Sequence, residues 1–201
     1  MSKITILLIS IAMTAMSCKP STVDITGNDQ KLNDSAAAGV KSPITWTNCG
    51  SSVGEHPCDF TLVDTDGNEV TLYDLYGKAI VVDFSTMWCY YCQVAAADIK
   101  GLVDSYNDKD LIYLTILAQN FQGETPTDED INEWARHFEI GEQLSPVLAG
   151  NMSMIDPTGV NGWQVESWPA FYFISKEMTI VNYLKGYSSY SITQGIESIV
   201  N

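Results

Sequence analysis

The sequence has few basic residues: ten lysines and arginines stand against 25 aspartates and glutamates, and the formal net charge is −15 over 201 residues. A chain with this charge lacks the positive surface with which proteins bind nucleic acids or anionic membranes. The apolar run from Ile4 to Met16 is also too short to cross a bilayer, which takes about 20 apolar residues. The sequence therefore argues against a nucleic-acid-binding protein and against a membrane span in this run.

The first 17 residues instead have the pattern of a secretory signal peptide, with Lys3 before the apolar run and small residues after it. The segment AMSC, residues 15–18, resembles the lipobox of bacterial lipoproteins, although its first position holds alanine where leucine is usual. In such proteins the signal is cut before the cysteine, which then carries the lipid. The resemblance predicts a lipid on Cys18, with ordinary signal cleavage as the alternative. Lys19 follows the cysteine in place of aspartate, which favours the outer membrane.

Residues 18–43 are predicted to hold the lipidated cysteine and a flexible tether, because they contain few large apolar residues and no steady period. A coil of about 25 residues reaches roughly 25–30 Å. One folded domain is expected over residues 44–201, and the 45% hydrophobic content is enough for its core. The protein is predicted to be exported and lipid-anchored at the periplasmic face of a bacterial envelope membrane.

With Cys18 assigned to lipid, four of the five cysteines remain: Cys49, Cys58, Cys89 and Cys92. An exported protein is expected to form disulfides, and proximity in the sequence favours Cys49–Cys58 and Cys89–Cys92. The CxxC pair follows a strand-like apolar run and admits three interpretations: a metal knuckle, a structural disulfide or a redox-active pair. Cys49–Cys58 is predicted to be structural, with a second redox pair that passes electrons to Cys92 as the alternative.

Apolar periodicity predicts an α/β domain. Alternating apolar residues on both sides of Asp66-Gly67-Asn68 predict a β-hairpin whose turn tolerates positive φ. Further strands are predicted over residues 79–84, 111–119, 170–175 and 179–186, with helices after Cys92, over 127–138 and over 191–200. This order of elements predicts a sheet that is covered on both faces.

A strand followed by WCxxC and a helix, with a later proline at the start of a hairpin, resembles thioredoxin. The stretch FTLVDTDGNEVTLYDLYGKAIVVDF, residues 60–84, is more specifically similar to the TlpA/ResA-like exported thioredoxins. The resemblance covers about residues 59–200. It implies a thioredoxin fold with an added N-terminal β-hairpin and an insertion, residues 119–162, before the cis-proline hairpin.

The resemblance implies a thiol–disulfide oxidoreductase. Cys89 would be the nucleophile, since unpaired N–H groups and the dipole at a helix N-terminus stabilise a thiolate there. Cys92, one turn along, would be the resolving thiol. Asp83 aligns with the buried aspartate of thioredoxin, which takes a proton from that thiol, and a buried carboxyl has a raised pKa that suits this role.

Three further residues take roles by the same resemblance. Pro169 would be the cis-proline, and the backbone of Trp168 would pair with the substrate as an added strand does. Trp88 would lie beside the thiols. Threonine or valine is commoner in the family where Trp168 stands, and core packing is the alternative role for both tryptophans.

The expected partners are protein thiol or disulfide clients and a redox partner protein, and no cofactor is expected. Three other functions compete. A zinc site would use the four cysteines or His56 and His137. A copper-delivery protein with a thioredoxin fold is the second. A thiol peroxidase is the third, because Thr86 stands three residues before Cys89, as in peroxidases of the related fold.

Overall fold

The computed structural model describes residues 43–159 and 162–201. The predicted signal peptide, Cys18 and all but the last residue of the predicted tether lie outside these residues. In the part of the chain that the structure describes, no helix combines the length and the apolar character that crossing a membrane requires.

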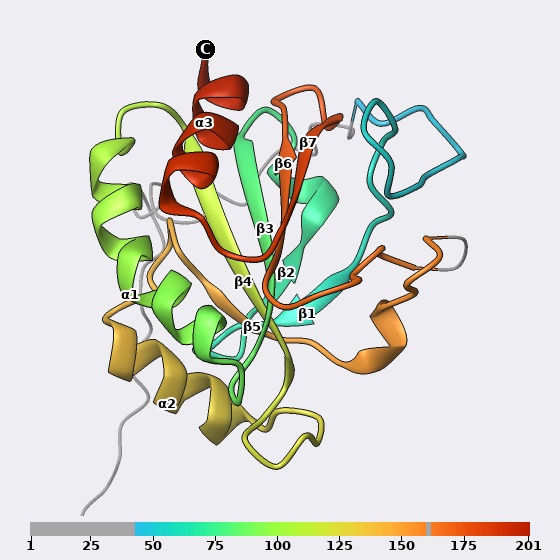
Figure 1. The fold of residues 1–201 in the computed structure, drawn as a ribbon. Helices are drawn as coiled ribbons and strands as arrows, with labels where there is room; N and C mark the ends of the chain where they lie inside the picture. Colours follow the sequence, from blue (N-terminus) through green and yellow to red (C-terminus); the bar gives the residue numbers. More distant parts are fainter. Residues whose placement is uncertain (1–42, 160–161) are drawn as a thin grey trace, which may run out of the picture. The chain divides into compact units, whose positions relative to one another are not determined.

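A mixed sheet of five strands, in the order β5-β4-β3-β6-β7, forms the centre of the domain (Figure 1). Its strands are β3 (Ala79–Thr86), β4 (Leu111–Gln119), β5 (Val147–Ala149), β6 (Ala170–Ile174) and β7 (Ile180–Lys185). β4 runs parallel to both β3 and β5, whereas β6 runs antiparallel to β3 and β7. Every residue of β3 is buried, as expected for a central strand with an unbroken apolar run.

Three α-helices cover one face of this sheet: α1 (Tyr90–Ser105), α2 (Asp128–Phe138) and α3 (Ser189–Val200) (Figure 1). Ile99 of α1, Trp134 of α2 and Ile196 of α3 belong to one buried cluster with Val81 of β3. Because side chains alternate along a strand, Asp83 projects from β3 toward the same helix-covered face.

The opposite face is covered without an α-helix, as far as the described residues show. Its layer consists of the hairpin β1 (Thr61–Val63) and β2 (Glu69–Thr71), the 3₁₀ helix η1 (Leu72–Leu75) and part of the segment before β6. Val82 and Phe84 of β3 pack there with Trp163. The sheet is thus covered on both faces, as predicted, but its helices lie on one face only.

The N-terminal hairpin differs in detail from the predicted alternation. β1 and β2 pair antiparallel over three residues each, and Leu72, expected to continue the second strand, begins η1 instead. Gly67 has a φ of 80° in the turn, a conformation that glycine adopts without strain. The carboxylate of Asp64 accepts hydrogen bonds from the backbone N–H groups of Asp66 and Asn68 and so holds the turn.

The insertion of residues 119–162 contains regular structure. It holds α2, which was predicted, together with β5 and the 3₁₀ helix η2 (Met152–Met154), which were not. Three-residue elements are too short to show a period, so only pairing with β4 defines β5. α2 begins with a capping box, in which Thr127 and Asp130 each bond the other's backbone N–H.

Candidate active site

The CxxC pair lies where β3 ends and α1 begins. Cys89 is the N-cap residue of α1, with an extended backbone, and its sulfur accepts a hydrogen bond from the N–H of Cys92 across 3.3 Å. Both side chains are free thiols. Cys89 is 8% exposed and Cys92 is 0% exposed. A disulfide that arrives from solvent therefore meets Cys89 first, and the helix N-terminus stabilises negative charge on that sulfur.

Cys92 is held in its protonated form. Burial raises the pKa of this thiol well above its ordinary value, and the hydrogen bond with Cys89 raises the pKa further. The negative charge of Asp83 acts in the same direction, whereas a hydrogen bond from the backbone of Thr86 opposes it. At neutral pH, Cys92 needs a base before it can attack a disulfide.

Asp83 has the properties of such a base. Its carboxyl is fully buried, and burial raises its pKa to about 7. The hydroxyl of Ser85 donates to Oδ1 at 2.7 Å, and the hydroxyl of Tyr113 donates to Oδ2 at 3.3 Å. Both hydrogen bonds favour the carboxylate and lower the pKa, so they limit the effect of burial. A carboxyl that titrates near neutrality can take up and release a proton at neutral pH.

Sequence reasoning missed Ser85 and Tyr113. Ser85 could have been found, since it lies two residues after Asp83 and strand alternation puts both on one face. Tyr113 could not, because its place depends on the parallel register, in which Asp83 pairs with Thr115.

Pro169 lies at the same edge of the sheet as the CxxC pair. The Trp168–Pro169 peptide bond is cis. The next residue, Ala170, pairs with Phe84 near the end of β3, so β6 starts where β3 ends. Trp168 is half-buried and packs against both core clusters, which means that core packing accounts for part of its role.

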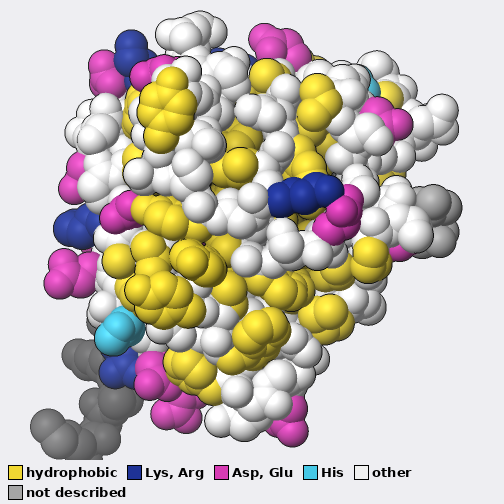
Figure 2. Space-filling model, viewed as in Figure 1, with side chains coloured by type: hydrophobic (Ala, Val, Ile, Leu, Met, Phe, Trp, Pro, Cys, Tyr) yellow, Lys and Arg dark blue, Asp and Glu magenta, His cyan; other side chains and the backbone are white. Residues whose placement is uncertain are grey.

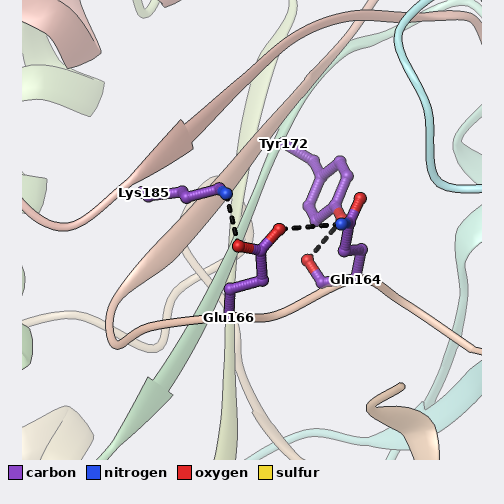
Figure 3. Close-up of polar contacts among 4 residues, drawn as sticks. All are labelled: Gln164, Glu166, Tyr172 and Lys185. Atoms are coloured by element: carbon purple, nitrogen blue, oxygen red, sulfur yellow. Dashed lines mark hydrogen bonds and ion pairs between the residues drawn. The ribbon is translucent and has the colours of Figure 1, made fainter. Parts of the chain in front are cut away.

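The segment that leads to this proline is tied to β6 and β7 (Figure 3). Glu166 accepts hydrogen bonds from Nε2 of Gln164 at 2.8 Å and from Nζ of Lys185 at 2.5 Å. The hydroxyl of Tyr172 donates to the backbone oxygen of Gln164 at 2.7 Å. These contacts anchor the approach to Trp168 on the sheet.

Trp88 lies on the surface beside the thiols. Its side chain is 47% exposed, and Nε1 donates to Oε1 of Gln119 at the end of β4, at 3.2 Å. Core packing therefore does not explain this tryptophan. Tyr90 and Tyr91, between the two cysteines, are exposed as well.

The sequence profile of the AhpC/TSA family matches residues 53–183. This chain belongs to the AhpC/TSA family. This chain is similar to two proteins that are named for redox chemistry. It is 26% identical over 132 residues to the thioredoxin-like protein YneN of Bacillus subtilis, covering 65% of this chain and 70% of that one. It is 19% identical over 134 residues to the thiol–disulfide oxidoreductase ResA of Bacillus thuringiensis, covering 67% and 70%.

Solved structures agree on the fold. The exposed lipoprotein thioredoxin Etrx1 of Streptococcus pneumoniae has 25% identity and a TM-score of 0.54, with 71% of this chain and 100% of that one covered. A thiol:disulfide interchange protein, DsbE, of Chlorobium tepidum has 18% identity and a TM-score of 0.57, with 75% and 99% covered. The comparisons confirm the predicted thioredoxin fold and the predicted class of enzyme, a thioredoxin-like thiol–disulfide oxidoreductase.

The peroxidase alternative was based on the position of Thr86, three residues before Cys89. A role for Thr86 in peroxide reduction at this site would require its hydroxyl to contact the Cys89 sulfur. In the structure this hydroxyl is buried and has no hydrogen-bond partner, so it does not bond Cys89. The geometry favours disulfide exchange over peroxide reduction at this site.

Cys49 and Cys58 are joined by a disulfide, with their Cα atoms 4.7 Å apart. Their loop lies against the turn between β6 and β7, where Ile180 exchanges backbone hydrogen bonds with Gly54 and Glu55. Ile180 pairs with the last residue of β6, whereas Pro169 precedes the first. The five residues of β6 span about 16 Å at about 3.3 Å each. Disulfide exchange requires contact between sulfur atoms, so this arrangement does not support a relay to Cys92.

The histidines and cysteines do not come together as a metal site. Within residues 43–159 and 162–201, no three side chains of metal-binding type are grouped for an ion. His56 stacks on Trp46 with ring centroids 3.7 Å apart, and its Nδ1 lies 2.6 Å from the backbone oxygen of Met178. Two of the four candidate thiols are held in the disulfide. The donor set that the zinc alternative requires is not assembled there.

Proposed function

We propose that this protein is an exported, membrane-tethered oxidoreductase. Its Cys89–Cys92 pair would exchange disulfide bonds with the thiols or disulfides of client proteins. One observation carries the proposal. Cys89 alone of the pair reaches solvent, Cys92 is buried and held protonated, and the Asp83 carboxyl that acts on Cys92 titrates near 7.

In the reducing direction, the thiolate of Cys89 attacks one sulfur of a client disulfide. A mixed disulfide forms, and the other client sulfur leaves as a thiolate that takes up a proton from solvent. Asp83 then accepts the proton of Cys92, and the Cys92 sulfur attacks that of Cys89. The second client sulfur leaves as a thiolate that takes up a proton, Asp83 releases the proton of Cys92, and the protein is left with a Cys89–Cys92 disulfide.

The same steps in reverse oxidise a client dithiol. A redox partner protein must restore the starting form of the Cys89–Cys92 pair in either direction, because each turnover transfers two electrons. Pro169 and the backbone of Trp168 are proposed to hold the client strand beside Cys89, since they lie at the same edge of the sheet.

Tethering rests on the sequence before the domain. The pattern of residues 1–18 supports export and a lipid on Cys18, and residues 19–43 supply a tether. Etrx1, one of the similar structures, is itself described as an exposed lipoprotein. A domain on such a tether reaches clients near the membrane without lying on it.

Trapping tests the exchange mechanism. Cys89→Ser should abolish reduction of a protein disulfide such as insulin. Cys92→Ser should accumulate mixed disulfides with clients, visible on non-reducing gels and reversed by dithiothreitol. Full insulin reduction by the Cys89→Ser protein would overturn the assignment of the nucleophile. Cys49→Ser is not a suitable control because it leaves Cys58 unpaired; the double variant Cys49→Ala/Cys58→Ala serves instead.

A further inference from the structure

A cavity of about 300 Å³ opens beside the CxxC pair. Its walls include the apolar side chains of Met87, Phe121, Trp134 and Phe138, and its polar and charged members are Gln93, Glu133 and His137. The volume is at the lower end of the range for ligand pockets, about 300–1,000 Å³, and so suits one large side chain.

Two hydrogen bonds fix this cavity next to the reacting cysteine. The backbone N–H of Gln93 donates to the oxygen of Cys89 at 3.2 Å, and Nε2 of Gln93 donates to the oxygen of Met87 at 2.8 Å. Met87 lies two residues before Cys89, and Gln93 lies one helical turn after it. These two cavity residues are thus held beside the reacting cysteine.

The sheet order puts the cavity and the cis-proline on opposite sides of Cys89. β4 flanks β3 on one side, and the loop after it carries Phe121. β6 flanks β3 on the other side and begins directly after Pro169. A client segment that pairs with the backbone of Trp168 and presents its sulfur to Cys89 crosses from the β6 side of β3 toward the β4 side, where the cavity opens.

Exposed aromatic side chains lie in and next to the CxxC motif and in the loop after β4. Trp88, Tyr90, Tyr91 and Phe121 are 47%, 69%, 59% and 52% exposed, respectively. Figure 2 shows a broad group of hydrophobic side chains over the region where α1 and α2 lie in Figure 1. On a chain with a net charge of −15, a group of exposed apolar side chains marks a site of contact with another molecule.

We infer that this cavity is a specificity subsite for a large apolar side chain, leucine or phenylalanine, that stands close to the reacting cysteine in the client. The inference rests on the proposed function and adds a selection among clients. Burial of the side chain between Met87, Phe121 and Trp134 fixes the client segment, so that its sulfur meets Cys89.

Matched peptides test this subsite. Each peptide carries a disulfide and differs from its partner only in having phenylalanine or alanine two residues from the attacked cysteine, before it in one set and after it in the other. In one of the two sets, kcat/KM should be about 10-fold higher for the phenylalanine peptide, the lower end of the effect of filling an apolar pocket.

Substitutions at Phe121 test whether the preference for the phenylalanine peptide arises in the cavity. This residue is exposed and can be changed without disturbing the core. Phe121→Ser should reduce the ratio of the two kcat/KM values several-fold, whereas Phe121→Leu should keep most of it. Tyr190→Ser, which removes a 74% exposed aromatic side chain from α3, should leave the ratio unchanged. Circular dichroism of each variant verifies the fold.

The outcomes separate the two proposals. If the protein exchanges with none of the peptides while Cys89 is reduced, the proposed function fails. If it exchanges with all of them at equal kcat/KM, only the subsite is overturned. A preference for phenylalanine that survives Phe121→Ser also overturns the subsite, because the preference then arises elsewhere.

Discussion

The hydroxyl of Tyr113 donates to Oδ2 of Asp83 across 3.3 Å, inside the helix-covered face of the sheet. Both side chains are fully buried, and burial raises the pKa of Tyr113 well above its ordinary value. Tyr113 therefore stays a hydrogen-bond donor at every pH at which the protein works. The hydroxyl of Ser85 donates to the other carboxylate oxygen of Asp83. The two hydrogen bonds stabilise the charged carboxylate, whereas burial disfavours it.

Replacing Asp83 by asparagine should slow resolution of mixed disulfides near neutral pH. The buried Cys92 thiol then has no carboxylate to accept its proton, and its raised pKa keeps it protonated. The loss should shrink as the pH rises, because hydroxide and external bases take over. Rapid-quench measurement of the lifetime of a mixed disulfide from pH 6 to 9 follows this. Equal rates for both proteins over that range would remove Asp83 from the mechanism.

The same substitution should change the pH dependence of stability. Asp83 titrates near 7 when folded, against an ordinary value of 3.8, so the folded state retains a proton that the unfolded state loses. Stability is therefore lost as the pH rises from about 4 to 7. Asp83→Asn removes this loss and should be more stable than the wild type at pH 8, by on the order of 4 kcal/mol at 1.36 kcal/mol per pKa unit.

Urea unfolding at pH 4, 6 and 8 measures that difference. Other groups titrate alike in the two proteins, so the difference between them isolates Asp83. The gap should grow from pH 4 to pH 8. A gap that stays constant with pH would show that the carboxyl of Asp83 titrates at its ordinary value in the folded protein.

Removing the two hydroxyl donors should move the Asp83 titration upward. Ser85→Ala and Tyr113→Phe each take away a hydrogen bond that stabilises the carboxylate, so each should raise the pKa of Asp83. The effect of Ser85→Ala should be the larger, since its bond is 2.7 Å and that of Tyr113 is 3.3 Å. Tyr172→Phe, on the opposite face of the sheet, is the matched control.

Carbon-13 NMR of the Asp83 carboxyl, in protein labelled at aspartate, reads this titration directly. The midpoint of the pH profile for mixed-disulfide resolution should shift in the same direction. If both variants lost stability but kept the wild-type midpoint, the hydroxyls would have a packing role only.

The sequence was enough for the elements that have a clear period or a distinctive motif. The apolar run of β3 and the helical spacing after Cys92 predicted the strand–helix junction that holds the thiols, and the structure has it. Asp83 was assigned its role because it lies in this strand and aligns with the buried aspartate of thioredoxin. These features depend on neighbours along the chain, which a sequence displays.

What the sequence did not reveal depends on register and long-range packing. Tyr113 reaches Asp83 because β3 and β4 pair in one particular register. The cavity beside Cys89 needs the loop after β4 to meet α2, where Asn120 bonds the capping residue Asp130 at 3.3 Å. The position of α1, α2 and α3 on one face also follows from packing, and their periodicity alone does not specify it.

Lipidation of Cys18 is predicted for the protein in its native host. Mass spectrometry of the mature protein should find an acylated N-terminus at residue 18, because lipobox-type signals are cut directly before the cysteine. Cys18→Ser should release the domain from the membrane fraction. A free N-terminus near residue 19 would rule the lipid out.

The Cys49–Cys58 disulfide should stabilise the domain and take no part in catalysis. It closes a loop with a sequence separation of nine residues, for which the chain-entropy estimate gives roughly 2–3 kcal/mol. The double variant Cys49→Ala/Cys58→Ala should lose about that much free energy of unfolding, measured in urea, while it retains the disulfide-exchange rate.

In a graded glutathione buffer the Cys49–Cys58 bridge should stay oxidised at potentials where Cys89–Cys92 is already reduced. The bridge lies at the far end of β6 from Pro169, so reduction of one pair should leave the potential of the other unchanged. Joint reduction of both pairs at one potential, or unchanged stability with halved turnover, would instead make Cys49–Cys58 a second redox pair.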